Sequence, residues 1–294
     1  MRTLKNKILA LAMLVFVNVV QAQYIEIGAS LGVASYQGDI NPLAWRLSFQ
    51  GARFQKGISL GYHFNPYFGV KLKFMDTFLE ANDNLSLSHG RKIRNLHFKS
   101  DLKEYSICFE TEALNLLPWF KSQKLKPYLL FGVGVFQFNP KAKLNGIWHE
   151  LQPLGTEGQG LPGSENGLYS LTQFTIPLGV GFRYHVDKNV IISIEVTPRI
   201  TFTDYIDDVS TTYPDLALLR ENRGQIAYDI AFKGDEMAGF EGNPLDWSGS
   251  PRGNPNENDW YATSTITFTY RLDPEFTISK KRKFAGYYHC PFEK

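Results

Sequence analysis

The sequence predicts an all-β fold, an eight-stranded antiparallel transmembrane β-barrel with long extracellular loops and a C-terminal tail. Three observations predict it. Long segments alternate between apolar and polar residues, which is the period of a β-strand. Aromatic residues make up 14% of the 294-residue chain, although its mean hydropathy is only −0.24. The connections between the alternating segments are mostly either very short or very long, as in outer-membrane barrels.

The clearest alternation lies in residues 174–202. One face carries large apolar side chains along residues 174–186 and again along residues 190–202. The other face carries glycines, threonines and charged residues, and the polar residues 187–189 join the two segments. This pattern predicts a hairpin of two long strands.

Six further segments alternate in the same way, and together with the hairpin they give eight strands. They are residues 24–36, 57–64, 68–74, 99–113, 128–138 and 260–272. The connections at residues 65–67 and 187–189 are short and that at 114–126 is intermediate. Those at 37–56, 80–98, 139–172 and 203–259 are long. Short turns on the periplasmic side and long loops outside are typical of outer-membrane barrels.

In this arrangement the charged residues of the strands point into the barrel. They are Glu26, Glu104, Glu110, Glu112 and Glu195, together with Lys71, Lys73, Arg183, Arg199 and Arg271. An eight-stranded barrel has room inside only for side chains. Five carboxylates and five cations are therefore expected to form ion pairs, because an unpaired buried charge is costly. We expect a filled interior rather than a pore, which disfavours a porin.

A soluble β-sandwich or a lipocalin-like barrel remains an alternative, since the strand period alone does not say which face meets water. In either of these folds the charged face would lie outside and the apolar face would line a core or cavity. The net charge of +2 gives no electrostatic reason to expect a nucleic-acid partner.

Residues 1–22 resemble a secretory signal peptide. Arg2, Lys5 and Lys7 precede an apolar stretch at residues 8–20, and residues 20–22 provide a cleavage site. An uncleaved anchor helix is the alternative, but the apolar stretch is short for a membrane span. Export would deliver the barrel, residues 23–272, to the outer membrane and leave the tail, residues 273–294, in the periplasm.

The sequence offers few candidate catalytic or metal sites. It contains no hydrolase, zinc-protease or phosphate-loop motif, so we expect no enzyme and no cofactor. Asp204, Asp207 and Asp208 could supply oxygen ligands to calcium, although carboxylates at the start of a loop are more often solvated. The glycine-rich residues 155–160 form either a ligand loop or a simple turn. Trp148, His149 and Glu150 are the polar set to test for an enzyme site at the barrel rim.

The tail is the predicted partner-binding segment. It combines a basic run with aromatic residues and one of the two cysteines; the candidate residues are Lys280, Lys281, Arg282, Lys283, Tyr287, Tyr288, Cys290 and Phe292. Cys108 is predicted to face the barrel interior, so a disulfide to Cys290 would strain the tail. Both thiols are expected to be free, or Cys290 forms an intermolecular disulfide. A disordered terminus is the alternative for the whole segment.

Four stretches of the sequence resemble a known family. They are residues 35–42 (SYQGDINP), 62–66 (YHFNP), 152–160 (QPLGTEGQG) and 202–213 (FTDYIDDVSTTY). The chain resembles the PorG-like outer-membrane barrels of the type IX secretion system of Bacteroidota along nearly all of its predicted mature length. The resemblance implies an eight-stranded barrel that anchors the periplasmic PorK–PorN ring to the outer membrane and contacts the PorK lipoprotein. It implies no catalytic residues.

Two non-enzymatic functions follow as hypotheses. The first is a barrel that ties PorK-like and PorN-like ring proteins to the outer membrane. The second is a ligand-binding or adhesin-type barrel that uses its four long outside loops. Lipid is an expected partner in both cases, and nucleic acid in neither.

Overall fold

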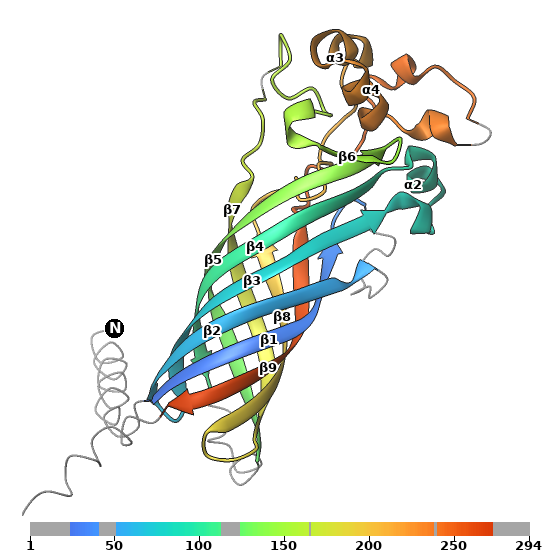
Figure 1. The fold of residues 1–294 in the computed structure, drawn as a ribbon. Coiled ribbons are helices and arrows are strands. Elements are labelled where there is room, and N and C mark those ends of the chain that lie inside the picture. The colour runs from blue at the N-terminus through green and yellow to red at the C-terminus, as the bar shows by residue number, and fades with distance from the viewer. Residues whose placement is uncertain (1–23, 41–50, 113–123, 165, 238–239, 273–294) are drawn as a thin grey trace, which may run out of the picture.

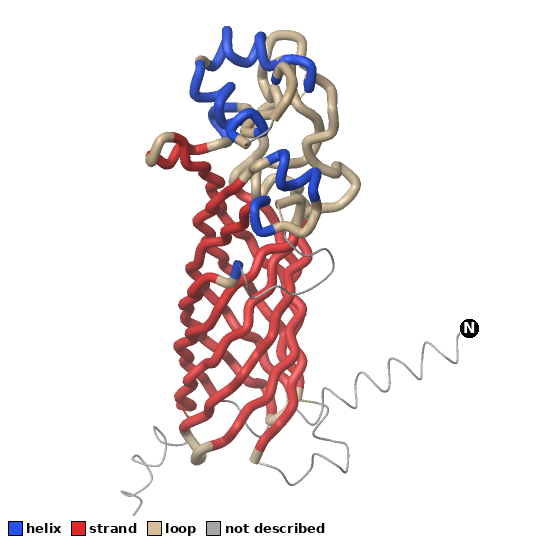
Figure 2. Tube along the Cα trace, turned by 90° about the vertical axis from the view of Figure 1, so that its right-hand side faces the viewer, coloured by secondary structure: helices blue, strands red, loops and turns tan. Residues whose placement is uncertain are grey.

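The computed structural model describes residues 24–40, 51–112, 124–164, 166–237 and 240–272. Its strands form a tall, tilted barrel with helices and loops gathered at one end (Figures 1 and 2). The strands are β1 (Tyr24–Gln37), β2 (Arg53–Asn65), β3 (Phe68–Asn82), β4 (His97–Thr111), β5 (Leu125–Leu144), β6 (Ile147–Glu150), β7 (Thr172–His185), β8 (Val190–Thr201) and β9 (Trp260–Leu272). The predicted signal peptide and tail lie outside the described residues.

The helices are short and lie in the connections between strands. They are the α-helices α2 (His89–Arg94), α3 (Leu216–Arg223) and α4 (Gln225–Ala231), and the 3₁₀-helices η2 (Asp83–Leu85), η5 (Gln152–Leu154), η6 (Gly234–Glu236) and η7 (Pro244–Trp247). Among the described residues, no helix has the length and apolar character that a membrane span requires.

Eight strands close into a ring, which confirms the predicted fold class. Hydrogen-bonded neighbours follow the order β4, β3, β2, β1, β9, β8, β7, β5, and β5 pairs again with β4. All pairs are antiparallel, and β6 is a short addition that folds back on the top of β5. Because the ring is closed, no strand edge is left unpaired around it.

The first residue of β1 and the last residue of β9 lie at the same end of the barrel, where Ile25 pairs with Leu272. That end also holds the short connections from β2 to β3 and from β7 to β8. At the first of these turns, the Asn65 side chain accepts hydrogen bonds from the backbone N–H groups of Tyr67 and Phe68. The connections from β3 to β4, from β5 to β7 and from β8 to β9 lie at the opposite end, which we call the crown (Figure 2).

The outer face of the lower barrel is apolar and exposed. Phe174 is 69% exposed, Ile58 64% and Ile194 58%. Water does not tolerate an apolar surface of this extent on a monomer, whereas lipid requires it. The barrel is therefore an outer-membrane protein, and the soluble alternatives would have placed these side chains in a core.

The interior of the lower barrel is filled by ion pairs, as predicted. Arg183 lies among Glu26, Glu110 and Glu112, and its Nη1 lies 3.0 Å from Glu112 Oε1. The other contacts are Lys71–Glu110 at 2.8 Å, Lys73–Glu195 at 2.6 Å, Arg199–Glu104 at 2.7 Å and Arg271–Glu26 at 3.3 Å. His63 and the hydroxyls of Tyr128 and Tyr261 also join this network.

Toward the crown the polarity of the wall inverts. On β4 the outward residues change from Tyr105 to Lys103 and Asp101, while the inward residues change from Glu104 to Leu102 and Phe98. The inward apolar side chains form one core with residues of β1, β3, β5, β9 and the loop after β8. The upper barrel is thus built like a soluble barrel, with its apolar side inside.

This inversion corrects several predicted boundaries. The strands β2, β3 and β5 extend beyond the predicted 57–64, 68–74 and 128–138, so the loops 37–56, 80–98 and 139–172 are shorter than predicted. Most of the additions lie at the crown end, where the outward side chains are mostly polar and the apolar-outside pattern no longer applies; β5 also gains residues 125–127 at the turn end. The predicted loop 203–259 also contains α3 and α4, which pack with Tyr213, Phe232 and Trp247.

The ion pairs make a stability prediction. Arg199→Met should lower the free energy of unfolding by about 3–5 kcal/mol, because Glu104 would remain buried without its cation. Lys141→Met, which removes a partly exposed pair with Asp101, should cost at most about 1 kcal/mol. Urea unfolding in lipid vesicles, followed by heat-modifiable gel mobility, measures both. Equal losses in the two variants would contradict the filled-interior interpretation.

Candidate functional site

Three of the four sequence stretches that carry the family resemblance meet beneath the crown. The end of β1, the loop with residues 152–160 and the loop after β8 contact one another through buried polar side chains. We call this contact region the crown cluster and define it as Tyr36, Asp39, Thr156, Glu157, Asp204, Asp207, Asp208, Arg252 and Asp259.

Tyr36 is the centre of the crown cluster. Its hydroxyl lies 2.5 Å from Asp207 Oδ2 and 2.8 Å from Asp259 Oδ1. A hydroxyl carries a single proton, so it can donate to only one of these two carboxylates. The other contact requires a protonated carboxyl that donates to the tyrosine oxygen. Asp207 and Asp259 therefore hold a proton between them in the folded crown.

Backbone groups fix both carboxylates in place. Asp207 accepts hydrogen bonds from the N–H groups of Ile40 and Val209, at 3.1 and 2.9 Å, and Asp259 accepts one from Ile206 at 2.8 Å. The backbone of Gly38 lies directly over the pair. A Cβ there would fall 1.8 Å from Asp259 Oδ1 and 2.0 Å from the Tyr36 hydroxyl, so only glycine fits.

A second group of contacts joins the glycine-rich loop to the loop after β8. The Glu157 carboxylate accepts hydrogen bonds from the N–H groups of Ser210 and Thr211 and lies 3.0 Å from Arg252 Nη1. The Thr156 hydroxyl donates to Asp208. Gly155, Gly158 and Gly160 have φ of +58°, +83° and +70°. The glycines thus shape a turn that places Thr156 and Glu157, which agrees with the turn alternative rather than a ligand loop.

Burial raises the pKa of the aspartates in the crown cluster. It raises the pKa of Asp204 to about 8 and that of Asp207 to about 7. The pKa of Asp208 rises to about 6, because burial outweighs the opposing effect of Arg252. Burial and the neighbouring Asp207 raise the pKa of Asp259 well above its usual value. The guanidinium of Arg94 pairs with Asp83 and donates to the Asp39 carbonyl, so it does not neutralise these carboxylates directly.

The three candidate calcium ligands lie in this cluster, and two of them, Asp207 and Asp208, turn to different partners. Asp207 binds Tyr36 and backbone N–H groups, whereas Asp208 accepts hydrogen bonds from Thr156 and Tyr169. Across the described ranges, no group of three or more His, Cys, Asp or Glu side chains is arranged to hold a metal ion. The alternative, that these carboxylates are solvated, is also wrong, because all three side chains are buried. They are buried structural groups.

The rim residues considered for an enzyme site lie on the projecting β5–β6 hairpin. Trp148 contacts His97 edge to face at 6.3 Å, and Glu150 accepts a hydrogen bond from the Asn139 side chain. His149 lies opposite Ala142 on the same hairpin. Cys108 is buried and free, facing inward as predicted. Residues 280–283, Tyr287, Tyr288, Cys290 and Phe292 lie outside the described residues.

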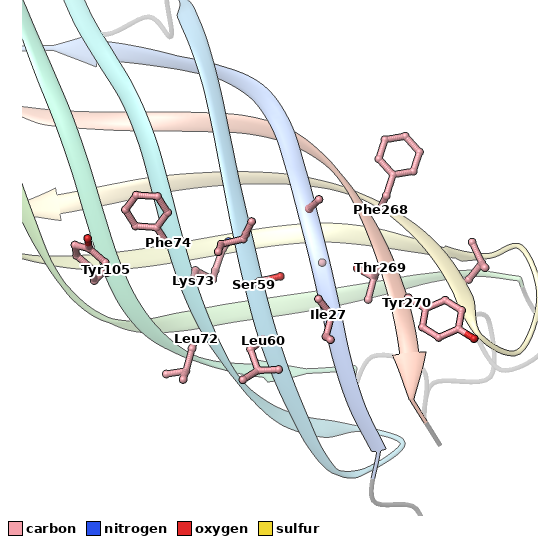
Figure 3. A pocket seen from close by; sticks show the side chains of 14 residues that line it. Ile27, Ser59, Leu60, Leu72, Lys73, Phe74, Tyr105, Phe268, Thr269 and Tyr270 are labelled. Atoms are coloured by element: carbon pink, nitrogen blue, oxygen red, sulfur yellow. The ribbon is translucent and has the colours of Figure 1, made fainter. Parts of the chain in front are cut away.

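A shallow groove of about 690 Å³ crosses the outer wall over β1, β2, β3 and β9. Figure 3 shows Leu60, Leu72 and Phe268 projecting from the strands around it. The groove lies within the apolar belt, and its exposed lining is almost entirely hydrocarbon. It presents no convergent polar groups of the kind that orient a polar ligand.

Comparison with known families gives one match. The model for the domain of unknown function DUF6089 matches residues 5–151, which is half of the chain. The chain belongs to the DUF6089 family. In this DUF6089 chain the matched segment runs through β1 to β6 and includes two residues of the crown cluster, Tyr36 and Asp39. No curated protein matches the sequence.

Several solved structures are similar to the DUF6089 chain at low identity. Ail, the attachment invasion locus protein of Yersinia pestis, has 12% identity and a TM-score of 0.35, with 86% of this chain and 99% of that chain covered. Neisserial surface protein A has 11% identity and a TM-score of 0.36, covering 86% and 98%. A major outer membrane protein from Thermus thermophilus has 11% identity and a TM-score of 0.39, covering 86% and 100%. The barrel assignment itself rests on the strand pairings.

Sequence reasoning found Asp204, Asp207 and Asp208 but missed their partners. One partner, Tyr36, is far from the aspartates in the chain. Two others, Arg252 and Asp259, fall in a segment without a strand period. The available signal was that Tyr36, Thr156 and Glu157 belong to stretches that carry the family resemblance.

The raised pKa values predict that the crown cluster loosens at alkaline pH. A carboxyl with a raised pKa stabilises the fold fully below its ordinary pKa of about 3.9, and this contribution is lost as pH rises through the raised value. For Asp207 alone, with a pKa of about 7, opening should become about tenfold more favourable from pH 6 to pH 8. Hydrogen exchange of the Ile40, Ile206 and Val209 amides, corrected for intrinsic base catalysis, measures this opening.

Asp207→Asn is the matched variant for this experiment. An amide has the same shape but does not titrate, so the increase in opening with pH should be smaller than in the wild type. Equal protection of the three amides at pH 6 and pH 8 in the wild-type protein would contradict the prediction.

Proposed function

We propose that this chain is a non-enzymatic outer-membrane subunit of the type IX protein secretion system, which anchors a PorK-like and PorN-like periplasmic ring to the membrane. The resemblance of residues 35–42, 62–66, 152–160 and 202–213 to the PorG-like barrels motivates the specific system. Three of these stretches make the crown cluster and the fourth forms the turn between β2 and β3. They therefore correspond to distinct structural features of this barrel.

One observation supports an anchoring role above others: the barrel is closed and its interior is filled. Arg183, Glu26 and Glu110 are each at most 2% exposed, so the lumen offers no route for a substrate or a secreted chain. What remains for protein contacts is the crown at one end and the short turns at the other. The last described residue, Leu272, lies on the side of the short turns. We propose that this side faces the periplasm, which brings the tail, residues 273–294, to the ring.

The basic run of the tail gives the proposal an electrostatic test. Replacing Lys280, Lys281, Arg282 and Lys283 together by Gln should reduce the ring proteins that co-purify with the tagged barrel. Deleting residues 280–294 should remove them, while the barrel still shows heat-modifiable mobility. The matched control is Lys124→Gln, Lys126→Gln and Lys188→Gln, which removes basic residues from the same end of the barrel.

Retention of the ring proteins by the deletion variant, or their equal loss in the control, would contradict the tail-anchor proposal. The pull-down should be run with and without reductant. A Cys290-linked partner is expected to appear as a heavier band without reductant and to disappear in Cys290→Ser.

The adhesin-type alternative has one observation in its favour. The β5–β6 hairpin projects from the crown and exposes Ile147 and Trp148, at 63% and 44%. In that case Ile147→Ser with Trp148→Ser would abolish surface binding, whereas the tail deletion would not. The anchoring proposal predicts the reverse pattern for ring attachment.

A further inference from the structure

The outer wall of β2 to β5 carries a row of charged side chains directly above the apolar belt. Lys56 pairs with Asp76 across β2 and β3, Asp76 with Lys103 across β3 and β4, and Lys103 with Gln137 across β4 and β5. The next row toward the turns is apolar throughout; it consists of Ile58, Phe74, Tyr105 and Val135. Ile58 and Tyr105 are 64% and 63% exposed. The charged row therefore lies at the height of the outer-leaflet headgroups.

This row has more lysines than carboxylates. Asp76 lies 3.2 Å from Lys56, whose side chain is 62% exposed. Lys103 stands on the other side of the same aspartate, points outward and has no ion-pair partner among the described residues. One carboxylate thus serves two ammonium groups, which leaves a net positive charge facing the headgroups.

Two further lysines lie two outward rows above this row, beyond Asp101 and Asn139. Lys99 and Lys141 lie opposite each other on β4 and β5, where like charges are unfavourable without an anion. Lys99 lies over the Phe78 ring at 4.3 Å and pairs with Glu80 across β3 and β4. Lys141 is 2.9 Å from Asp101 and pairs with Glu150 across β5 and β6. The net positive charge is therefore confined to the row of Lys56 and Lys103.

We propose that this wall binds the phosphate groups of an anionic glycolipid in the outer leaflet. Lys56 and Lys103 supply the contacts. Lysine ammonium groups are compact charges that bind phosphate through up to three donors. Two strands separate Lys56 from Lys103, which places their backbones about 10 Å apart. The apolar row below contacts the acyl chains of the same lipid, so the site recognises both parts of it.

The test uses the full-length barrel in nanodiscs of zwitterionic lipid, titrated with diphosphorylated lipid A. The double variant Lys56→Gln/Lys103→Gln is compared with Lys126→Gln/Lys188→Gln, which removes two lysines from the turn end. Near a membrane surface each lysine contributes about 1 kcal/mol to binding an anionic lipid. The first variant should therefore bind about 30-fold more weakly, and the control should bind as the wild type does.

Three further measurements make the result decisive. Lipid A without its phosphates should bind both the wild type and the double variant weakly, and Lys56→Arg/Lys103→Arg should retain most of the affinity. Inorganic phosphate at the same concentration should not displace the lipid. Equal binding by the double variant and the control, or displacement by free phosphate, would overturn the proposal. Heat-modifiable mobility verifies that every variant is folded. The inference does not depend on the secretion role.

Discussion

The structure depends on the neutralisation of charges inside a closed ring of eight strands. The lumen is too narrow for bulk water, so each carboxylate that points inward needs a cation or a hydroxyl within reach. Arg183 meets this need for three glutamates from β1 and β4, and Arg199 and Lys73 do so for Glu104 and Glu195. These contacts join strands on opposite sides of the ring and fix the barrel as one rigid unit.

A filled interior moves any function to the ends and the outer wall of the barrel. The crown end is held by buried polar contacts, in which the Tyr36 hydroxyl bridges Asp207 and Asp259 and these two carboxylates hold a proton between them. The turn end is short and leads directly into the tail. The outer wall is apolar along the belt. On β2 to β4 the charged residues Lys56, Asp76 and Lys103 follow directly above it. The crown end, the turn end and the outer wall therefore differ in chemistry.

The alternation of residues was sufficient to predict the membrane-spanning part of the fold. In the hairpin of β7 and β8, apolar and polar residues keep one phase throughout, and the predicted faces and ion pairs are confirmed. On β4 the period of two also continues, but Lys103 and Leu102 exchange the roles that Tyr105 and Glu104 have below. A prediction that assumes an apolar outer face therefore assigns the wrong face above that point, although it found the strand itself, predicted as residues 99–113 and observed as His97–Thr111.

The crown cluster was beyond sequence reasoning for a different reason. Its members are separated by up to 223 positions, as for Tyr36 and Asp259, and lie in loops with no repeating pattern. Periodicity reports which face of a strand is buried, but it says nothing about which loops meet. The three aspartates near Tyr205 were visible as candidates, yet their partners and their burial came only from the closed barrel that brings β1 beside β9.

The most direct test of the membrane assignment is the lipid exposure of the outer wall. Nitroxide labels would be placed on single cysteines at Ile27, Ile107, Ile194 and Gln137 in a Cys108→Ser/Cys290→Ser background, with the protein in lipid vesicles. We expect labels at the three isoleucine positions to collide with oxygen and to be shielded from a water-soluble nickel complex. The label at Gln137, above the apolar belt, should show the opposite preference. Equal access of the nickel complex to all four positions would contradict a lipid-facing barrel with a filled polar interior.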